Sequence, residues 1–287
     1  MLLEPKFLER LERLSLSARG RLRGAYPGEH RSLRLGSSVD FADWRPYVEG
    51  DDFRRIDYQI YARLDRLVVR LYEAEDELTL RLVVDTSSSM GFERKLEVAT
   101  KLAGALAYLA GVRGDRARAW AIDSSGLVPG PWVRSRDSAI ALFAWLEGLR
   151  AARSTSLVGG LRRLSSAGAT NAVTVLLSDL LTEEWEAALR RLGGPGAEAA
   201  VMHVLAPSEL EPDARGDLLL VDSEAGSSVE VSLSESALNA YRQRAGDWRN
   251  AVAETCRRRG VSYALVAPDC DLEALLLVDL RRDGLVR

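Results

Sequence analysis

The chain has 287 residues, of which 47% are hydrophobic and 28% are charged. This composition is sufficient for a packed core and excludes a wholly disordered protein. The net charge of −3 argues against a dedicated binder of polyanions, while two cysteines and two histidines exclude a disulfide scaffold, a cysteine-rich zinc site and a site built on several imidazoles.

The first seventy-odd residues contain a predicted helix and an aromatic cluster. Apolar residues at helical spacing, with Pro5 suited to a first turn, predict a helix over Pro5–Leu14. Aromatic rings with polar groups dominate both cores and interfaces, so the cluster is interpreted either as a satellite core packed on a larger domain or as a partner surface. Its members are Phe41, Trp44, Tyr47, Phe53, Tyr58 and Tyr61. A turn at Gly50-Asp51-Asp52 leads into a short capped helix, and Leu67–Tyr72 is a β-rich run.

From Leu78 onward, strands alternate with helices, which predicts a mostly parallel sheet covered on both faces. The predicted strands are Leu80–Val84, Ala117–Ile122, Val173–Leu177, Ala200–Leu205 and Val261–Val266. The predicted helices are Glu93–Ala110, Asp137–Leu149, Leu157–Leu164, Glu183–Leu192 and Ser234–Arg259. Leu127–Val133 is expected to form the second arm of a hairpin at the sheet edge, and Asp217–Leu233 a small inserted hairpin.

Acidic and hydroxyl side chains follow two of the predicted strands. Asp85 ends the first strand, with Ser87 and Ser89 at alternate positions after it, and Asp179 follows the strand Val173–Leu177. Ligands of doubly wound sheets bind beyond the carboxyl ends of strands, where the winding direction reverses. If the two strands are neighbours there, about 4.8 Å apart, the two acids face each other. A hard cation such as Mg2+ removes their repulsion, and Ser154-Thr155-Ser156 offers a third hydroxyl.

Other interpretations of these residues were compared with metal binding. The Asp85–Ser89 run is also typical of a helix cap. Metal-assisted phosphoryl transfer with Asp85 as nucleophile is the enzymatic alternative, although Ser87 stands where a second acid normally acts as proton donor. None of the three lysines lies in a phosphate-binding loop. His203, inside an apolar strand, and Cys256, on an apolar helix stripe, are expected to be core residues.

Two motifs together carry a family resemblance. Asp85-Thr86-Ser87-Ser88-Ser89, with Thr155 and Asp179, resembles the metal-ion-dependent adhesion site (MIDAS) of von Willebrand factor A domains. The aromatic and acidic runs Phe41-Ala42-Asp43-Trp44-Arg45-Pro46-Tyr47 and Gly50-Asp51-Asp52-Phe53-Arg54-Arg55-Ile56-Asp57-Tyr58, followed by Tyr61-Ala62-Arg63, resemble the bacterial domain-of-unknown-function 58 family over nearly the whole chain.

This resemblance implies a von Willebrand A-like sheet of strand order 3-2-1-4-5-6 with one antiparallel edge strand. It also implies a metal site for Mg2+, with Mn2+ as the alternative. Ser87 and Ser89 would bind the ion directly, Thr155 directly or through water, and Asp85 and Asp179 largely through water. A carboxylate from a partner would complete the shell. Family members commonly have Gly before the Thr and Asp after it, whereas Ser154 and Ser156 flank Thr155 here, so either serine could replace it.

The sequence thus predicts an α/β protein with two parts. Residues 1–77 form an aromatic-rich accessory segment, and residues 78–287 form a von Willebrand A-like domain with a hairpin inserted near 215–233. The expected function is non-enzymatic, metal-dependent capture of an exposed Asp or Glu of a partner protein. By resemblance, that partner is a MoxR-type AAA ATPase that acts in maturation of client proteins.

The cell compartment and the remaining partner classes follow from absent patterns. No apolar stretch approaches the roughly 18 residues of a membrane-spanning helix, and residues 1–6 lack a signal-peptide pattern. We therefore expect a soluble cytoplasmic protein without a membrane span. The basic segment Lys6–Arg34 contains no motif that would align its charges along a groove, so no nucleic-acid partner is expected.

Overall fold

The chain divides into two units, residues 20–77 and the remainder, and each is described here by itself. The structure is a computed structural model. It describes residues 2–12, 41–49, 51–72, 78–123, 126–151, 156–166, 172–192, 198–213, 216–222 and 227–276.

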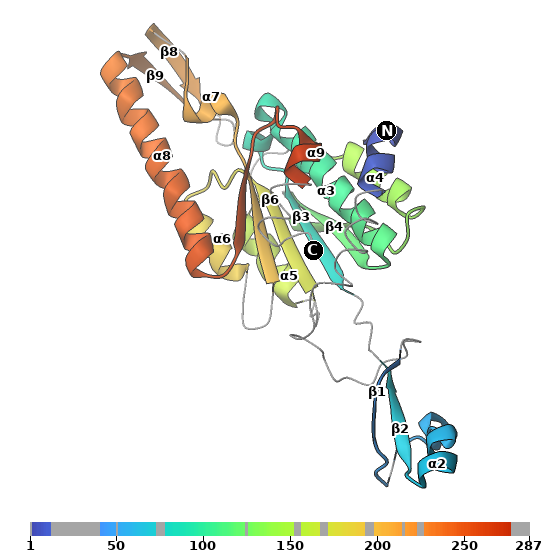
Figure 1. Cartoon of the computed structure of the whole chain (residues 1–287). Coiled ribbons are helices and arrows are strands. Elements are labelled where there is room, and N and C mark those ends of the chain that lie inside the picture. Colours follow the sequence, from blue (N-terminus) through green and yellow to red (C-terminus); the bar gives the residue numbers. More distant parts are fainter. Residues whose placement is uncertain are drawn as a thin grey trace. The chain divides into compact units, whose positions relative to one another are not determined.

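The larger unit is built on a six-stranded sheet of order β10-β7-β6-β3-β4-β5 (Figure 1). Neighbouring strands pair in parallel except β5, which pairs antiparallel with β4 at the edge. Counted along this unit, the order is 3-2-1-4-5-6, so the predicted doubly wound, von Willebrand A-like fold and its edge hairpin are confirmed. The strands are β3 (Thr79–Asp85), β4 (Arg116–Asp123), β5 (Gly126–Val133), β6 (Ala172–Ser178), β7 (Glu198–Val204) and β10 (Ser262–Val266).

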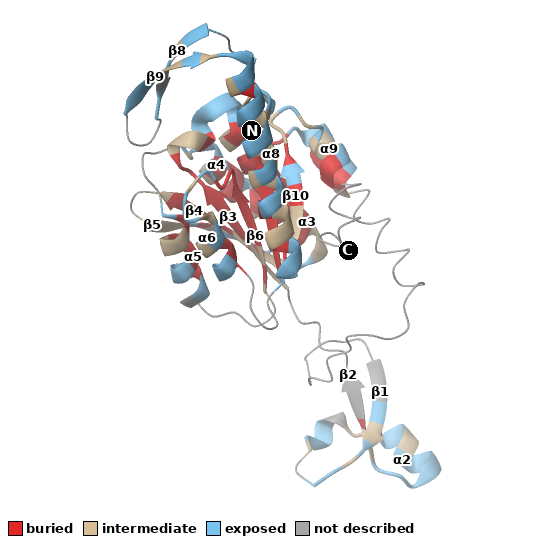
Figure 2. Cartoon of the chain, turned by 90° about the vertical axis from the view of Figure 1, so that its left-hand side faces the viewer, coloured by how far each residue is buried: buried red, intermediate tan, exposed pale blue. Residues whose placement is uncertain are grey.

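Helices cover both faces of this sheet, and the strands between them are buried (Figure 2). Because side chains alternate along a strand, Leu82 and Val84 of β3 join one core while Val83 joins the other. The first core includes α3 (Lys95–Arg113) and α4 (Ala139–Glu147). The second includes α5 (Leu157–Ser166), α6 (Trp185–Arg191) and α8 (Glu235–Arg258).

The larger unit also contains short elements that the sequence pattern did not predict. They are the 3-10 helix η2 (Ser88–Arg94), α7 (Pro207–Leu210) and α9 (Leu272–Ala274). Helix α3 therefore begins at Lys95 and not at Glu93. The expected inserted hairpin consists of β8 (Gly216–Val221) and β9 (Ser228–Leu233), which pair antiparallel.

The first residues of the chain pack in the core of the larger unit. Residues 5–12 are helical, and Leu11 is 1% exposed within the same core as α3 and α4. Close approach is allowed by Gly104, whose added Cβ would lie 2.6 Å from Leu2 Cδ2. Glu12 accepts a hydrogen bond from Tyr108 and pairs with Arg136. The expected division after residue 77 therefore differs from the structure, because helical spacing predicts this helix but not the surface on which it packs.

The smaller unit pairs β1 (Phe41–Pro46) with β2 (Val68–Tyr72) and adds the 3-10 helix η1 (Phe53–Arg55) and α2 (Tyr58–Leu64). The predicted cap at Asp52 accepts a hydrogen bond from Arg54 N. Asp57 is the more buried acid; it caps α2 through Gln59 N and accepts a hydrogen bond from Trp44 Nε1 at 3.1 Å.

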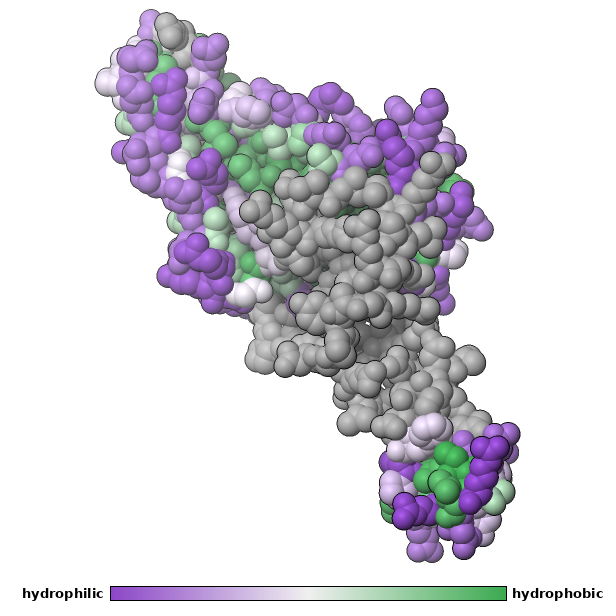
Figure 3. Space-filling model, viewed as in Figure 1, coloured by the Kyte–Doolittle hydropathy of each residue, from purple (hydrophilic) through white to green (hydrophobic). Residues whose placement is uncertain are grey.

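Four of the six residues of the aromatic cluster are exposed and do not form a core within this smaller unit. Trp44, Phe53, Tyr58 and Tyr61 are between 43% and 64% exposed. Figure 3 shows hydrophobic side chains at the surface of the unit, among hydrophilic ones. Among its described side chains, Val69 is the one buried apolar residue.

The helices in the described ranges were also compared with the requirements of a membrane span. None of them combines the length and the apolar character that crossing a bilayer demands.

Replacing Leu11 tests whether the first helix belongs to the core of the larger unit. Leu11→Ala should lower the free energy of unfolding by about 2–5 kcal/mol, because it removes buried methyl groups and leaves a cavity. Leu64→Ala, at a position that is 65% exposed in α2, should change it by less than about 0.5 kcal/mol. Urea unfolding followed by circular dichroism measures both, and equal effects would contradict the assignment.

Candidate functional site

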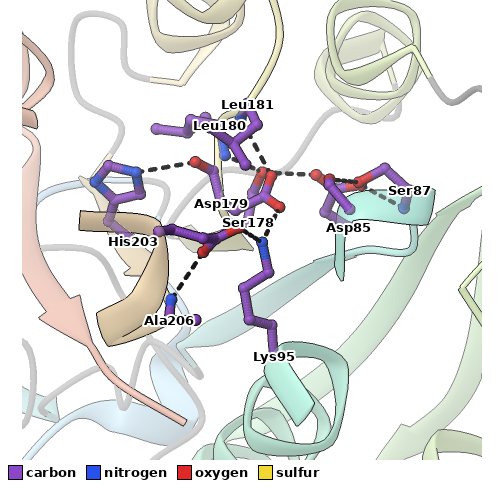
Figure 4. Close-up of polar contacts among 11 residues, drawn as sticks. Asp85, Ser87, Lys95, Ser178, Asp179, Leu180, Leu181, His203 and Ala206 are labelled. Atoms are coloured by element: carbon purple, nitrogen blue, oxygen red, sulfur yellow. Dashed lines mark hydrogen bonds and ion pairs between the residues drawn. The ribbon is translucent and has the colours of Figure 1, made fainter. Parts of the chain in front are cut away.

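The candidate site lies where β3 and β6 end side by side. Their parallel register pairs Val84 with Leu177. Because β3 lies between β4 and β6, the winding direction of the sheet reverses at this point, which is where ligands of such sheets bind. The next residue of each strand makes a direct contact, since Ser178 Oγ donates a hydrogen bond to Asp85 Oδ2 at 2.6 Å (Figure 4). The structure thus brings together the two strand ends that the sequence analysis singled out.

Asp85 is buried at this junction, with 2% of its surface exposed. Its Oδ1 accepts a hydrogen bond from Ser87 N at 2.9 Å. Burial and, second, the nearby charge of Asp179 raise its pKa to about 6, although hydrogen bonds from Ser178 and Ser87 act in the opposite direction. A cation beside these two acids would favour their charged forms.

The two serines of the loop after β3 converge. Ser87 Oγ and Ser89 Oγ lie 3.0 Å apart, and the loop is held to β4 because Thr86 Oγ1 donates to Ile122 O at 2.8 Å. Ligand oxygens at adjacent corners of an octahedron, about 2.1 Å from Mg2+, lie about 3 Å apart. The hydroxyl pair therefore fits two adjacent positions around that ion.

Purely acidic or imidazole metal sites do not occur in the part of the chain that the structure describes. No group of three His, Cys, Asp or Glu side chains that could by itself hold a metal ion is found there. A divalent ion would therefore depend on serine hydroxyls, which is the donor set that the sequence analysis proposed.

The structure does not locate the third hydroxyl that was expected to bind the metal ion. Thr155 and Ser154 lie outside the described residues. Ser156 is described and exposed, and its Oγ accepts a hydrogen bond from Gly159 N at 3.1 Å. Ser156 therefore acts as a cap at the start of α5.

Asp179 is held by contacts on both of its carboxylate oxygens. Oδ2 accepts a hydrogen bond from Lys95 Nζ at 2.7 Å, and Oδ1 accepts one from Leu181 N at 3.1 Å (Figure 4). Lys95 is fully buried and also lies 2.5 Å from Glu209 Oε1. The second oxygen of Glu209 accepts a hydrogen bond from Ala206 N at 2.8 Å.

Sequence reasoning missed Lys95 and Glu209. Lys95 lies four residues before Ala99 and eleven before Leu106, on the apolar stripe of α3. A lysine on such a stripe must be paired, and that signal could have been used. Glu209 gives no comparable signal, because α7 is a single turn.

His203 is a core residue, as predicted, and it supports the site by contacting the backbone of Asp179. Its Nε2 lies 2.9 Å from the backbone oxygen of Asp179, and its Nδ1 lies 2.9 Å from Tyr263 Oη. Burial is the main reason why its pKa is lowered, to about 4. In the neutral ring Nε2 must donate, because a carbonyl only accepts, and Nδ1 then accepts from the tyrosine hydroxyl.

Three of the four described non-glycine residues with positive φ lie in the segments that follow β3 and β6. Leu180, with φ of 53°, follows Asp179, while Glu93 and Arg94, with φ of 41° and 64°, end η2. Non-glycine residues hold this conformation only where surrounding contacts enforce it. At Leu180 such a contact is visible, since its N–H donates to Ser178 Oγ at 3.0 Å.

The charges of the site match a divalent cation. When ionised, Asp85, Asp179 and Glu209 carry three negative charges, and Lys95 carries one positive charge. A dication would neutralise the two negative charges that remain, so both the charge of the site and its oxygen donors fit Mg2+.

Comparison with known proteins gives a family match and several uncharacterised relatives. The family model described as "Protein of unknown function DUF58" matches residues 43–251. Uncharacterized proteins of Mycobacterium tuberculosis and Mycobacterium bovis are each 28% identical over 291 residues, which covers 98% of this chain and 92% of the relative.

Several solved structures are similar at low identity. The conserved hypothetical protein BatB from Bacteroides thetaiotaomicron is 12% identical with a TM-score of 0.42, and an aerotolerance-related membrane protein from Bacteroides fragilis is 14% identical with a TM-score of 0.44. Each alignment covers 72% of this chain and 98% of the other. A von Willebrand factor type A structure from Catenulispora acidiphila is 13% identical, with a TM-score of 0.39, and 75% of this chain and 43% of that one are covered.

The hydroxyl of Ser178 is predicted to stabilise the junction of β3 and β6. Ser178→Ala removes the bond to Asp85 and leaves Leu180 N without this acceptor, so the free energy of unfolding should fall by about 1–3 kcal/mol. Ser232→Ala removes a similar serine bond to Asp217 on an exposed hairpin and should cost less than about 0.5 kcal/mol. Chemical denaturation measures the free energy of unfolding of both variants. Equal stability of Ser178→Ala and the parent would contradict a stabilising role of the Ser178 hydroxyl.

Proposed function

Since this chain belongs to the DUF58 family, whose model spans residues 43–251, we propose that it is a non-enzymatic, metal-dependent adaptor that binds an acidic side chain of a partner protein. One observation carries this proposal above the others. The hydroxyls of Ser87 and Ser89 converge at 3.0 Å beside a buried aspartate, at the reversal point of the sheet.

The residues of the site would bind an ion in two ways, directly and through water. Ser87 and Ser89 would offer neutral oxygens directly, and Asp85 and Asp179 would act largely through water. Because the two hydroxyls add no charge, a bound Mg2+ would remain an electrophilic centre that accepts a further acidic oxygen. Without it, Asp85, Asp179 and Glu209 outnumber Lys95 in charge, and an incoming carboxylate would be repelled.

The partner proposed on family resemblance is a MoxR-type AAA ATPase that acts in maturation of client proteins. Two of the three lysines form ion pairs with acidic side chains of this chain, so they are not available to bind nucleotide phosphates. Lys95 lies between two acids, and Lys101 Nζ lies 2.7 Å from Glu97. A cycle of binding and release would therefore draw its energy from a separate ATPase.

The enzymatic alternative uses Asp85 as a nucleophile for metal-dependent phosphoryl transfer or hydrolysis. Contacts of Asp85 disfavour it, because one oxygen accepts from Ser178 Oγ and the other from Ser87 N. The side chain is also 2% exposed. A nucleophile needs a lone pair directed at an accessible substrate.

Loss of the Asp85 charge is predicted to weaken metal binding. Asp85→Asn keeps the shape of the side chain but removes its charge, so the affinity for Mg2+ and Mn2+ in calorimetric titration should fall by about tenfold or more. Ser87→Ala should also weaken binding, since it removes a donor oxygen, whereas Ser88→Ala, in the same loop, is the matched control and should bind as the parent does.

The same variants test partner capture. Affinity capture from the source cell, with and without chelator, should recover an ATPase with the parent protein only when metal is present, and should not recover it with Asp85→Asn. Undiminished capture by a correctly folded Asp85→Asn protein would contradict the proposed site.

Turnover is not expected. The purified protein with Mg2+ should hydrolyse neither ATP nor p-nitrophenyl phosphate above a control without protein, because Asp85 is enclosed and no nucleotide loop is present in the sequence. Phosphate release measures this directly. Activity that follows the protein through purification and disappears in Asp85→Asn would favour the enzymatic alternative.

A further inference from the structure

Lys95 places its side-chain nitrogen inside the site. Its side chain has no exposed surface and lies 2.7 Å from Asp179 Oδ2 and 2.5 Å from Glu209 Oε1. The ring of Phe92 lies 5.9 Å from its Nζ. A buried ion pair contributes little net stability compared with apolar packing of similar volume, so stability is a weak explanation for placing an ammonium here.

We infer that Lys95 is a positioning residue that keeps Asp179 from binding the cation directly, lowers the affinity of the site for that cation, and so preserves a coordination position for the acid of a partner. This inference rests on the proposed function. It assigns a role to a residue that lies outside the sequence motif of the site.

The contacts of Asp179 fix the direction of its carboxylate. With Lys95 on Oδ2 and Leu181 N on Oδ1, moving this carboxylate onto a cation would break a charge-assisted hydrogen bond, which is stronger than a neutral one. Asp179 is therefore held as an outer acid that acts through water. Lys95 achieves this by binding the carboxylate itself.

The contacts of Glu209 explain why Lys95 does not move aside. Glu209, its other partner, accepts a hydrogen bond from Ala206 N at 2.8 Å, and the backbone oxygen of Glu209 accepts one from Tyr241 Oη in α8 at 2.7 Å. Ser208, the residue before it, donates to Glu93 at 2.7 Å. The ammonium is thus fixed between two anchored acids.

The remaining effect of Lys95 is electrostatic. A fixed unit charge near a dication opposes its binding, and in a shielded interior this repulsion is much stronger than in water. The site therefore binds its ion more weakly than its three acids alone would allow. Weak binding with an unfilled shell suits an ion that must accept an external carboxylate, because each added internal acid would reduce its attraction for one.

Removal of Lys95 should consequently improve metal binding, which damage to the fold would not do. In calorimetric titrations of the full chain with Mg2+ and Mn2+, Lys95→Met should bind at least about tenfold more tightly than the parent. Glu209→Gln, which leaves Lys95 paired with Asp179, should bind several-fold more weakly. Lys101→Met removes the same charge from the exposed side of α3 and is the matched control, expected to bind as the parent does.

Two further measurements distinguish the positioning of Asp179 by Lys95 from a purely electrostatic effect of the Lys95 charge. With Mn2+ bound, the water-proton relaxivity of Lys95→Met should fall below that of the parent, because Asp179 would replace water on the ion. In chelator Lys95→Met should melt at a lower temperature, since it leaves the buried Asp179 and the partly buried Glu209 without their ion pair. Mg2+ should raise its Tm more than it raises that of the parent.

The outcomes distinguish this inference from the proposed function. Absence of any metal binding by the parent protein would overturn both. Metal binding by the parent, with Lys95→Met no tighter, would overturn the role of Lys95 alone. If Lys95→Met does not fold, unchanged affinity in Glu209→Gln would overturn that role, and the expected weakening would support it.

Discussion

Parallel pairing of β3 with β6 forces two aspartates into one nearly dry position, and much of the surrounding structure compensates for that. Asp85 and Asp179 are 2% and 1% exposed, and two like charges repel each other more strongly there than in water. Ser178, Ser87 N and Lys95 each contribute a hydrogen bond to one of them. Contacts within the protein thus hold both acids in place.

Support for the site comes from parts of the chain that are remote in sequence. His203 of β7 contacts the backbone of Asp179, and α3 and α7 supply Lys95 and Glu209. Rigid elements hold these side chains, so the loops can adopt strained conformations such as that of Leu180. Much of the precision of the site therefore comes from residues that would not touch a ligand, which is how functional sites are generally supported.

Sequence alone predicted the sheet, its edge hairpin and the acids at its strand ends, because alternation of strands and helices and the chemistry at strand ends are local patterns. It did not predict the pairing of Lys95 with Asp179 and Glu209, which are 84 and 114 residues away, because no local pattern encodes a contact of that range. For the same reason, the helix over residues 5–12 was predicted as an element, whereas its packing beside α3 became visible only in the structure.

The position of residues 2–12 in the larger unit determines how the smaller unit is connected to it along the chain. Since the residues before 20 and after 77 both belong to the larger unit, the smaller unit is an insertion that is covalently connected at both of its ends. Anything bound by its exposed aromatic residues would be kept at a high effective concentration near the larger unit, and cleavage of one tether would not release it.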